Sequence, residues 1–254
     1  MNRPRCAYDI DFISKSLFST PKKVIYEAEE FYNDQLIDAV NNIGSHKIVL
    51  LSGPSSSGKT TTANKLCEGI RKCGHRCEVV SLDDFYHNRE HLPVINGKQN
   101  AEVVEALKVS LIHETIENLL NKGNSYLPKY DFFTGMRTDN VSFIDVGTDG
   151  IVIFEGIHAL NPKINKGIDK DKILEIYVSP HSDFDLNNKQ ILSKREARFL
   201  RRLVRDSWAR NTVPEKTIRL SITLPPDLSK GEKIKFLYKT LSGCSVPCSH
   251  KYTK

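Results

Sequence analysis

Short apolar runs separated by longer periodic stretches predict an alternating α/β fold for this chain. The runs cover 47–52, 78–82, 151–154 and 173–178, and Ile, Val and Leu dominate them. Continuous apolar runs of this length are typical of strands that are buried on both faces. Strands that alternate with helices favour a parallel, doubly wound sheet with right-handed crossovers.

Helical periodicity marks the segments around these runs. Apolar residues recur at helical spacing over 22–43 and again over 101–120, where Gly123 follows as a stop signal. The stretch 61–73, which follows the first apolar run after a short glycine-rich segment, is predicted to form a helix. The stretch 193–209 is predicted to form a strongly basic helix. The sequence therefore predicts helices on both sides of the sheet.

The segment 127–137 combines aromatic, acidic and basic side chains, and we expect it to be a loop. Such a loop could line a pocket, because binding residues are concentrated on loops that a rigid scaffold positions. A packed surface loop without a ligand is the alternative.

Composition narrows the class of protein. The chain has 254 residues, of which 39% are hydrophobic and 27% charged, as expected for one α/β domain with peripheral additions. No apolar run approaches the roughly 20 residues that cross a bilayer, so we expect a cytoplasmic protein without a membrane partner. The net charge of +6 fits a protein that handles polyanionic nucleotides. No aromatic-basic RNA motif accompanies it, and nucleic acid is not an expected partner.

The segment after the first apolar run carries the most specific chemistry. Its pattern is G-x-x-x-x-G-K-[ST], between a predicted strand and a predicted helix. Small residues let backbone N–H groups face one point at a helix N-terminus, whose dipole favours an anion. A Ser/Gly-rich turn with a solvated lysine, the alternative, does not explain the spacing. We assign these residues to nucleotide phosphates, with Lys59 at the β- and γ-phosphates and Thr60 at Mg²⁺: Gly53, Ser55, Ser56, Ser57, Gly58, Lys59, Thr60 and Thr61.

Four groups of residues occur in an order that resembles a known family. They are GPSSSGKTT at 53–61, SLDDFY at 81–86, YDFFTGMR at 130–137 with FEGIHALNP at 154–162, and RRLVRDSWAR at 201–210. Together they resemble the uridine kinase-like nucleoside kinases of the P-loop kinase superfamily, in the branch that includes phosphoribulokinase. The resemblance implies a three-layer α/β fold, in which helices flank a parallel sheet and an Arg-rich helical lid covers the nucleotide.

The activity that this resemblance implies is ATP-dependent phosphorylation of a small-molecule hydroxyl, first of all the 5′-hydroxyl of uridine or a related nucleoside. ATP and Mg²⁺ would be its cofactors, and a homo-oligomer is expected by analogy alone. Two alternatives stay open. The acceptor could be another small alcohol, such as a sugar phosphate or a pantothenate-like compound, or the chain could be a vestigial nucleotide-binding protein without catalysis.

The resemblance also assigns roles to acidic residues at the ends of predicted strands. Asp83 matches the family's general base or orienter of the acceptor hydroxyl, although helix capping is an alternative. Glu155 matches the acid that holds Mg²⁺. Glu102 falls roughly where the family places a ribose-binding acid. We interpret His158, which follows Glu155, as a structural histidine of the turn.

The remaining assignments concern the substrate loop and the lid. Tyr130, Phe132 and Arg137 match the nucleoside-pocket loop of the family. The lid arginines would neutralise charge on the transferred phosphoryl group, with Arg205 as a catalytic residue and Arg202 and Arg210 as nucleotide ligands. Asn100 and Lys108 depart from the family pattern, which tends to carry acids there, so acceptor specificity stays open.

The segment 221–254 departs most from the resemblance. When 230–250 is back-translated and read from the third base of each codon, some codon choices yield KNKIF and NAERMFSSMF, which resemble the family's continuation. We therefore expect an N-terminal helical extension (1–45), a P-loop kinase domain (46–220) and an atypical tail, translated out of frame.

Overall fold

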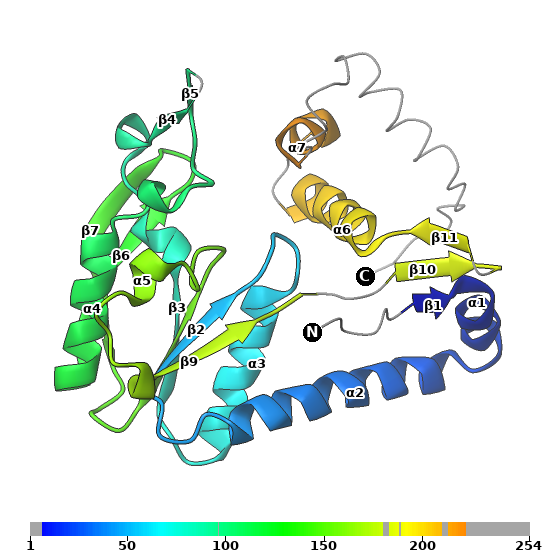
Figure 1. The fold of residues 1–254 in the computed structure, drawn as a ribbon, viewed down its shortest axis with the longest axis horizontal. Helices are drawn as coiled ribbons and strands as arrows, with labels where there is room; N and C mark the ends of the chain where they lie inside the picture. Colours follow the sequence, from blue (N-terminus) through cyan, green and yellow to red (C-terminus); the bar gives the residue numbers. More distant parts are fainter. Residues whose placement is uncertain (1–6, 96, 180–182, 188, 210–212, 222–254) are drawn as a thin grey trace. The chain divides into compact units, whose positions relative to one another are not determined.

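The computed structural model describes most of the chain, and Figure 1 shows its fold. Its residues form two compact units, 1–200 and 201–254, and each is considered by itself. The expected domain boundaries after 45 and 220 stay predictions, and the expected frame change falls outside the described residues. Those described are 7–95, 97–179, 183–187, 189–209 and 213–221.

The first unit is built on a parallel sheet of four strands, as the sequence predicts. Its strand order is β3-β8-β2-β9, so β2 lies between β8 and β9. Because all four strands run the same way, their carboxyl ends meet at one edge of the sheet. The strands are β2 (Ile48–Ser52), β3 (Cys77–Ser81), β8 (Ile151–Glu155) and β9 (Ile173–Tyr177).

Helices lie before, between and after these strands. The helix expected over 101–120 begins eight residues later than expected, and the others begin and end within two residues of their expected limits. In chain order the helices are α1 (Ile10–Ser19), α2 (Pro21–Asn41), α3 (Lys59–Lys72), α4 (Val109–Lys122), α5 (Pro162–Asn165), α6 (Lys194–Ala209) and α7 (Pro214–Ser221).

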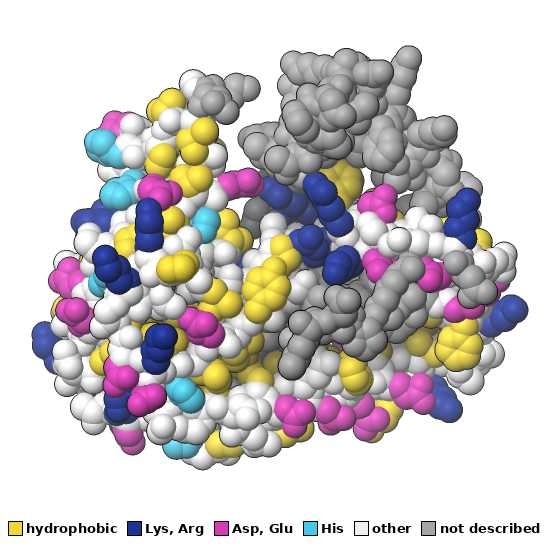
Figure 2. Space-filling view, in the orientation of Figure 1, with side chains coloured by type: hydrophobic (Ala, Val, Ile, Leu, Met, Phe, Trp, Pro, Cys, Tyr) yellow, Lys and Arg dark blue, Asp and Glu magenta, His cyan; other side chains and the backbone are white. Residues whose placement is uncertain are grey.

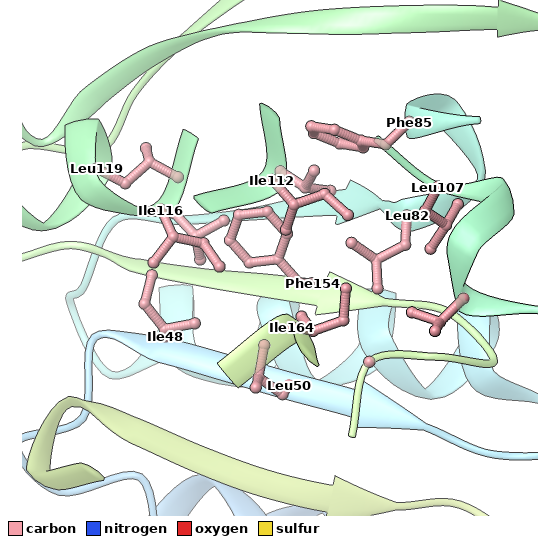
Figure 3. Packing of buried hydrophobic residues seen from close by; sticks show 14 of the residues in the cluster. Ile48, Leu50, Leu82, Phe85, Leu107, Ile112, Ile116, Leu119, Phe154 and Ile164 are labelled. Atoms are coloured by element: carbon pink, nitrogen blue, oxygen red, sulfur yellow. The ribbon is translucent and has the colours of Figure 1, made fainter. Parts of the chain in front are cut away.

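Alternation along β2 creates the two hydrophobic layers of the core. Ile48 and Leu50 belong to the cluster that includes Ile112 of α4, whereas Val49 and Leu51 belong to the cluster on α3. Neighbouring residues of a strand face opposite sides of the sheet, so one strand serves both layers. Figure 3 shows the α4 side of this packing, where Phe154 of β8 lies beneath the helix. The three-layer α/β arrangement of the P-loop kinase fold is therefore confirmed.

The N-terminal helix α2 packs against α3. The Tyr32 hydroxyl and Thr62 Oγ1 are 2.9 Å apart. Lys65 of α3 lies 3.5 Å from a Glu29 carboxylate oxygen and 4.7 Å from the centre of the Tyr32 ring. A row of acidic side chains follows the outer face of α2 (Figure 2). The helix expected over 22–43 thus braces the helix that follows the glycine-rich segment.

The predicted start of the helix over 101–120 was wrong, since α4 begins at Val109. Residues Val104–Ala106 form a 3₁₀ turn, η3, instead. Backbone bonds to a distant segment fix this turn, because His87 N–H donates to Ala106 O at 2.8 Å and Lys108 N–H donates to Phe85 O at 2.8 Å. The apolar spacing that suggested a helix reflects packing into the core. The end was predicted correctly, since Gly123 caps α4 at φ +73°.

The expected loop over 127–137 is a β-hairpin. Strand β6 (Asn124–Asp131) pairs with β7 (Met136–Asp145), and only the residues between them form a turn. Pro128 obscured the strand in the sequence, but the pairing register shifts between Leu127 and Lys129, a place where a strand tolerates proline.

Other short strands were not foreseen. β10 (Asp183–Leu186) pairs in parallel with β1 (Ala7–Asp9) and antiparallel with β11 (Lys189–Leu192), so the N-terminal part is not purely helical. A further two-stranded ribbon joins β4 (Val94–Ile95) to β5 (Lys98–Gln99).

Candidate active site

The glycine-rich segment forms a tight turn between β2 and α3. Gly58 precedes the helix at φ +94° and Ser56 lies at φ +61°. A Cβ on Gly53 would fall 2.1 Å from the carbonyl oxygen of Val178, so only glycine fits at that position. The turn and its neighbouring strand are joined there, because Val178 N–H donates to Ser52 O at 2.7 Å. The residues assigned to phosphate binding therefore surround the N-terminus of α3.

Two hydroxyl groups of this turn are buried without a protein partner. Ser56 Oγ and Ser57 Oγ make no hydrogen bond to any residue that the structure describes. A buried polar group without a partner is costly, and such groups usually bind water or a ligand. Hydroxyl donors beside a helix N-terminus fit an anion, so the turn suits a nucleotide triphosphate. Lys59, at the start of α3, donates to Pro54 O at 3.3 Å.

Glu155 ends β8 beside this turn. Its Oε1 accepts hydrogen bonds from Thr60 Oγ1 at 3.1 Å and from Ser81 Oγ at 3.4 Å, and the residue is only 7% exposed. Burial raises the pKa of Glu155 and the charge of Asp83 raises it further, against the lowering effect of Thr60, Lys59 and Ser81. A carboxylate and a hydroxyl from separate elements suit Mg²⁺, which keeps several water ligands. The donor set therefore fits the expected ion.

Asp83 lies just beyond β3 in the 3₁₀ turn η1 (Leu82–Phe85). Ser81 caps this turn, since its Oγ accepts from Asp83 N–H at 3.3 Å. Ser81, and not Asp83, is therefore the N-cap of this turn. The negative charge of Asp83 acts on Glu155, on His158 and on Tyr86, so Asp83 faces the same edge of the sheet as the phosphate turn.

The next acid, Asp84, fastens the hairpin to this edge. Its carboxylate accepts from Lys129 Nζ at 3.1 Å and from Tyr130 N–H at 3.3 Å. Sequence reasoning assigned no role to Asp84, although its place in the SLDDFY segment beside Asp83 was a usable signal. Asp84 positions the hairpin residues that were expected to bind the acceptor.

Aromatic rings gather where the hairpin meets η1. The ring centroid of Tyr130 is 5.5 Å from that of Tyr86 and 5.0 Å from that of Phe132. Tyr86 and Tyr130 are buried, whereas Phe132 is 62% exposed. Burial, with the charges of Asp83 and Glu102, raises the pKa of Tyr86. The structure thus brings Tyr130, Phe132 and Asp83 into one neighbourhood.

Arg137 is held by protein groups. Its Nε donates to Asp139 Oδ1 at 2.7 Å, its Nη1 donates to Tyr86 O at 2.8 Å, and its backbone N–H donates to Asn88 Oδ1 at 2.9 Å. Only 11% of the side chain is exposed. These contacts indicate a residue that shapes the hairpin, and its expected contact with substrate stays a prediction. No sequence pattern connects Arg137 with the distant Asn88, whereas Asp139 follows two residues later on the same face of β7.

Glu102 lies in the segment before η3. It is exposed, and its backbone N–H donates to Asn100 Oδ1 at 2.7 Å. Its charge acts on Tyr86 and on His158. The loosely placed acid of the sequence prediction therefore shares a neighbourhood with Asp83, and its ribose contact stays a prediction.

The expected lid residues belong to the second unit. Arg205 donates to Asp206 Oδ1 through Nη2 at 2.8 Å and through Nε at 3.0 Å. Arg202 Nε lies 3.5 Å from Asp206 Oδ2, which also accepts from Thr217 Oγ1 at 3.2 Å. Arg202 and Arg205 thus face the same way, as their spacing suggests. Arg210 lies outside the described residues.

The fold and the phosphate turn define a P-loop protein, and the sequence match identifies it as a kinase, that is, a phosphotransferase. The profile of the Phosphoribulokinase / Uridine kinase family matches residues 48–216, and the chain belongs to this family. The chain is 28% identical to a uridine kinase of Staphylococcus aureus (strain JH9) over 181 residues, which are 70% of this chain and 78% of that protein. The same values hold for the enzyme of strain Newman.

Solved structures of kinases superpose on parts of the chain. A possible uridine kinase from Bacillus stearothermophilus has 20% identity and a TM-score of 0.47, and the match covers 57% of this chain and 80% of that one. A D-glycerate 3-kinase from Cryptococcus neoformans has 22% identity and a TM-score of 0.35, with 53% and 52% covered. Because both TM-scores are below 0.5, family membership rests on the sequence match.

No helix in the part of the chain that the structure describes is long and apolar enough to cross a bilayer.

Proposed function

We propose that this protein transfers the γ-phosphoryl group of ATP to the 5′-hydroxyl of uridine or a related nucleoside. One observation carries the proposal: the phosphate turn, Glu155 and Asp83 follow β2, β8 and β3, which are neighbours in the sheet. Hydrogen bonds from Thr60 and Ser81 to Glu155 tie these three ends together. Phosphoryl transfer needs such an arrangement of triphosphate, metal ligand and acceptor group.

The phosphate turn would hold the triphosphate. Backbone N–H groups at the start of α3, the unpaired hydroxyls of Ser56 and Ser57 and the Lys59 ammonium supply its donors. Thr60 and Glu155 would hold Mg²⁺, which neutralises charge on the β- and γ-phosphates when it is bound. The resemblance assigns Arg202, Arg205 and Arg210 to charge neutralisation on the phosphates, and we retain this assignment as part of the proposal.

The acceptor would lie between Asp83 and the hairpin. Asp83 would orient the reacting hydroxyl and accept its proton. The exposed face of Phe132, supported by Tyr130, offers a surface on which a planar base can stack. The aromatic neighbourhood supports a nucleoside in preference to a simple alcohol.

Charge balance favours a neutral acceptor over a sugar phosphate or a pantothenate-like acid. Asp83 and Glu102 would repel an anion. Two nearby cations share one carboxylate, since Asp139 lies 2.7 Å from Arg137 and 3.8 Å from Lys108. An anionic acceptor would therefore meet excess negative charge at this place.

A coupled ATP-consumption assay with uridine, cytidine, pantothenate and a sugar phosphate tests the proposal. We expect turnover with a nucleoside, and Asp83→Asn should lower kcat about 10²- to 10⁴-fold because the proton acceptor is lost. Asp84→Asn is the matched control. It removes the neighbouring carboxylate, which holds Lys129 and the Tyr130 backbone, so it should lower the melting temperature with a much smaller effect on kcat.

Other outcomes would contradict specific parts of the proposal. Turnover of pantothenate or the sugar phosphate alone would replace the nucleoside as acceptor. A folded protein that binds ATP in calorimetry but turns over none of the acceptors would indicate a non-catalytic nucleotide-binding protein. An unchanged kcat in Asp83→Asn would remove the role of Asp83.

A further inference from the structure

Arg89 begins the 3₁₀ turn η2 (Arg89–His91) and has no role in the proposed function. Asn88, the residue before it, joins this segment to the hairpin, because Asn88 Oδ1 accepts from Arg137 N–H at 2.9 Å. Arg89 O accepts from Gln99 Nε2 of β5 at 2.7 Å. The backbone of Arg89 is thus bound both to the hairpin and to the ribbon of β4 and β5.

Arg89 binds the carbonyl groups of the hairpin turn, residues 132–135, which connects β6 to β7. Its Nη2 donates to Phe132 O at 2.9 Å and to Phe133 O at 3.4 Å, and its backbone N–H donates to Gly135 O at 2.7 Å. The guanidinium group packs directly on the turn, because a Cβ on Gly135 would lie 2.6 Å from Arg89 Nε. Three carbonyl groups of the hairpin turn therefore accept bonds from this one residue.

Asp131 binds the N–H groups of the same turn. Its Oδ1 accepts from Phe133 N–H at 2.7 Å and from Thr134 N–H at 3.4 Å, and its carbonyl oxygen accepts from Gly135 N–H at 2.7 Å. Asp131 is the last residue of β6, so its bonds shape the hairpin turn from within. Arg89 comes from a separate element, so its bonds hold the turn against the rest of the unit.

The hairpin turn carries Phe132, on which we expect the base of the acceptor to stack. The ring centroid of Phe132 lies 5.0 Å from that of Tyr130 and 6.2 Å from that of Tyr86, in edge-to-face arrangements. Those two tyrosines are buried, whereas Phe132 is 62% exposed. Two neighbouring rings on the buried side leave the exposed part of Phe132 to be positioned by its own backbone. Arg89 holds that backbone at Phe132 O.

We propose that Arg89 is a positioning residue for the base of the acceptor and that it acts by holding the hairpin turn and, with it, the ring of Phe132. This inference rests on the proposed function, in which the base stacks on Phe132. The bonds of Arg89 go to the hairpin turn and to β5, and none of those described goes to the phosphate turn. Loss of its side chain should therefore weaken binding of the nucleoside and leave the phosphoryl transfer step unchanged.

Steady-state kinetics of Arg89→Met with uridine and ATP test this inference. KM for uridine should rise about 3- to 10-fold, because the hairpin turn loses its bonds to the guanidinium group. By contrast, kcat and KM for ATP should stay within about twofold of the wild type. Arg89→Lys retains a cationic donor for Phe132 O and should recover most of the loss. The matched control is Arg71→Met, since Arg71 of α3 also donates to a backbone carbonyl, Cys77 O at 2.9 Å, and its loss should leave KM for uridine unchanged.

A double-mutant cycle separates positioning of Phe132 from a general loss of structure. Phe132→Ala removes the stacking surface and should raise KM for uridine about tenfold. If Arg89 acts through Phe132, adding Arg89→Met to Phe132→Ala should raise KM no further. Additive effects of the two substitutions would overturn the inference, as would an unchanged KM for uridine in Arg89→Met.

Hydrogen exchange separates failure of this inference from failure of the proposed function. In the ligand-free protein, Arg89→Met should speed exchange of the N–H groups of residues 133–135 about tenfold, because the hairpin turn opens more readily. Unchanged exchange would overturn the inference. Faster exchange with an unchanged KM for uridine would also overturn it and leave the proposed function intact. A folded wild type that turns over no nucleoside would overturn the proposed function itself, and this inference with it.

Discussion

The phosphate turn and the substrate hairpin satisfy their polar groups in opposite ways. In the turn, the buried hydroxyls of Ser56 and Ser57 have no partner in the described part of the chain. In the hairpin, Arg137 is bound to Asp139 and to Tyr86 O, and Lys129 is bound to Asp84 of η1. The first region is built for a ligand that the chain does not supply. In the second region, the polar groups bind one another and stabilise the hairpin.

This difference predicts opposite effects of substitution on stability. Removing a side chain from the hairpin should destabilise the protein, because its partners then lose their bonds. Removing an unpaired polar group from the phosphate turn should stabilise the protein while weakening ligand binding. Such trade-offs between stability and activity are common at functional sites.

The largest expected effect is at Arg137. Arg137→Met should lower the free energy of unfolding by about 2 kcal/mol, because Asp139 and the Tyr86 carbonyl lose a charged donor. Urea unfolding measures this change. Arg71→Met is the matched control, since Arg71 also bonds a carboxylate, Glu78 at 2.7 Å, and a backbone carbonyl, Cys77 O at 2.9 Å, but its side chain is half exposed. Exposed pairs contribute less than about 1 kcal/mol. Equal losses in the two variants would contradict the structural role of Arg137.

A smaller effect of opposite sign is expected at Ser57. Ser57→Ala should raise the free energy of unfolding of the ligand-free protein by about 1 kcal/mol, because an unpaired buried hydroxyl is removed. It should also weaken ATP binding in calorimetry. Ser52→Ala provides the control, since Ser52 is also buried but its Oγ donates to Ile157 O at 3.0 Å. That variant should be destabilised. A stabilised Ser52→Ala would show that the missing hydrogen-bond partner of Ser57 is not the cause of the effect.

The third effect depends on pH and concerns Glu155. Because burial raises the pKa of Glu155, the folded protein binds its proton more tightly than the unfolded chain does. The wild type therefore loses stability as pH rises through the raised pKa, and Glu155→Gln does not. The variant should melt at a higher temperature at pH 8, by a free energy on the order of 1 kcal/mol.

The difference between wild type and Glu155→Gln should disappear below the ordinary pKa of a glutamate, near 4.5, where both states are protonated. Thermal melting at several pH values between 4 and 8 measures the difference. A difference that stays constant over this range would show that the charge of Glu155 is not the cause.

The two regions also differ in how well the sequence predicts them. The phosphate turn is encoded by consecutive residues between a strand and a helix, so its pattern located β2, the turn and α3 correctly. The acids after β3 and β8 were found because strand ends of a parallel sheet meet at one edge. Local patterns are therefore sufficient where the structure depends on neighbouring residues.

The hairpin and the start of α4 depend on distant residues. The bond from Lys108 N–H to Phe85 O and the one from His87 N–H to Ala106 O replaced the expected helical turn. Asp84 pairs with Lys129 and Asp139 pairs with Lys108, and no spacing rule connects these residues. Such pairs arise from tertiary packing, which overrides the local propensity of a segment.

The alternation of Ile48, Val49, Leu50 and Leu51 along β2 also limits how the chain can change during evolution. An inserted or deleted residue in this strand would exchange the side chains of its two faces and shift the phosphate turn that follows. Length variation among homologues should therefore avoid the stretch from β2 to Lys59. Insertions at the tips of surface turns would leave this register unchanged.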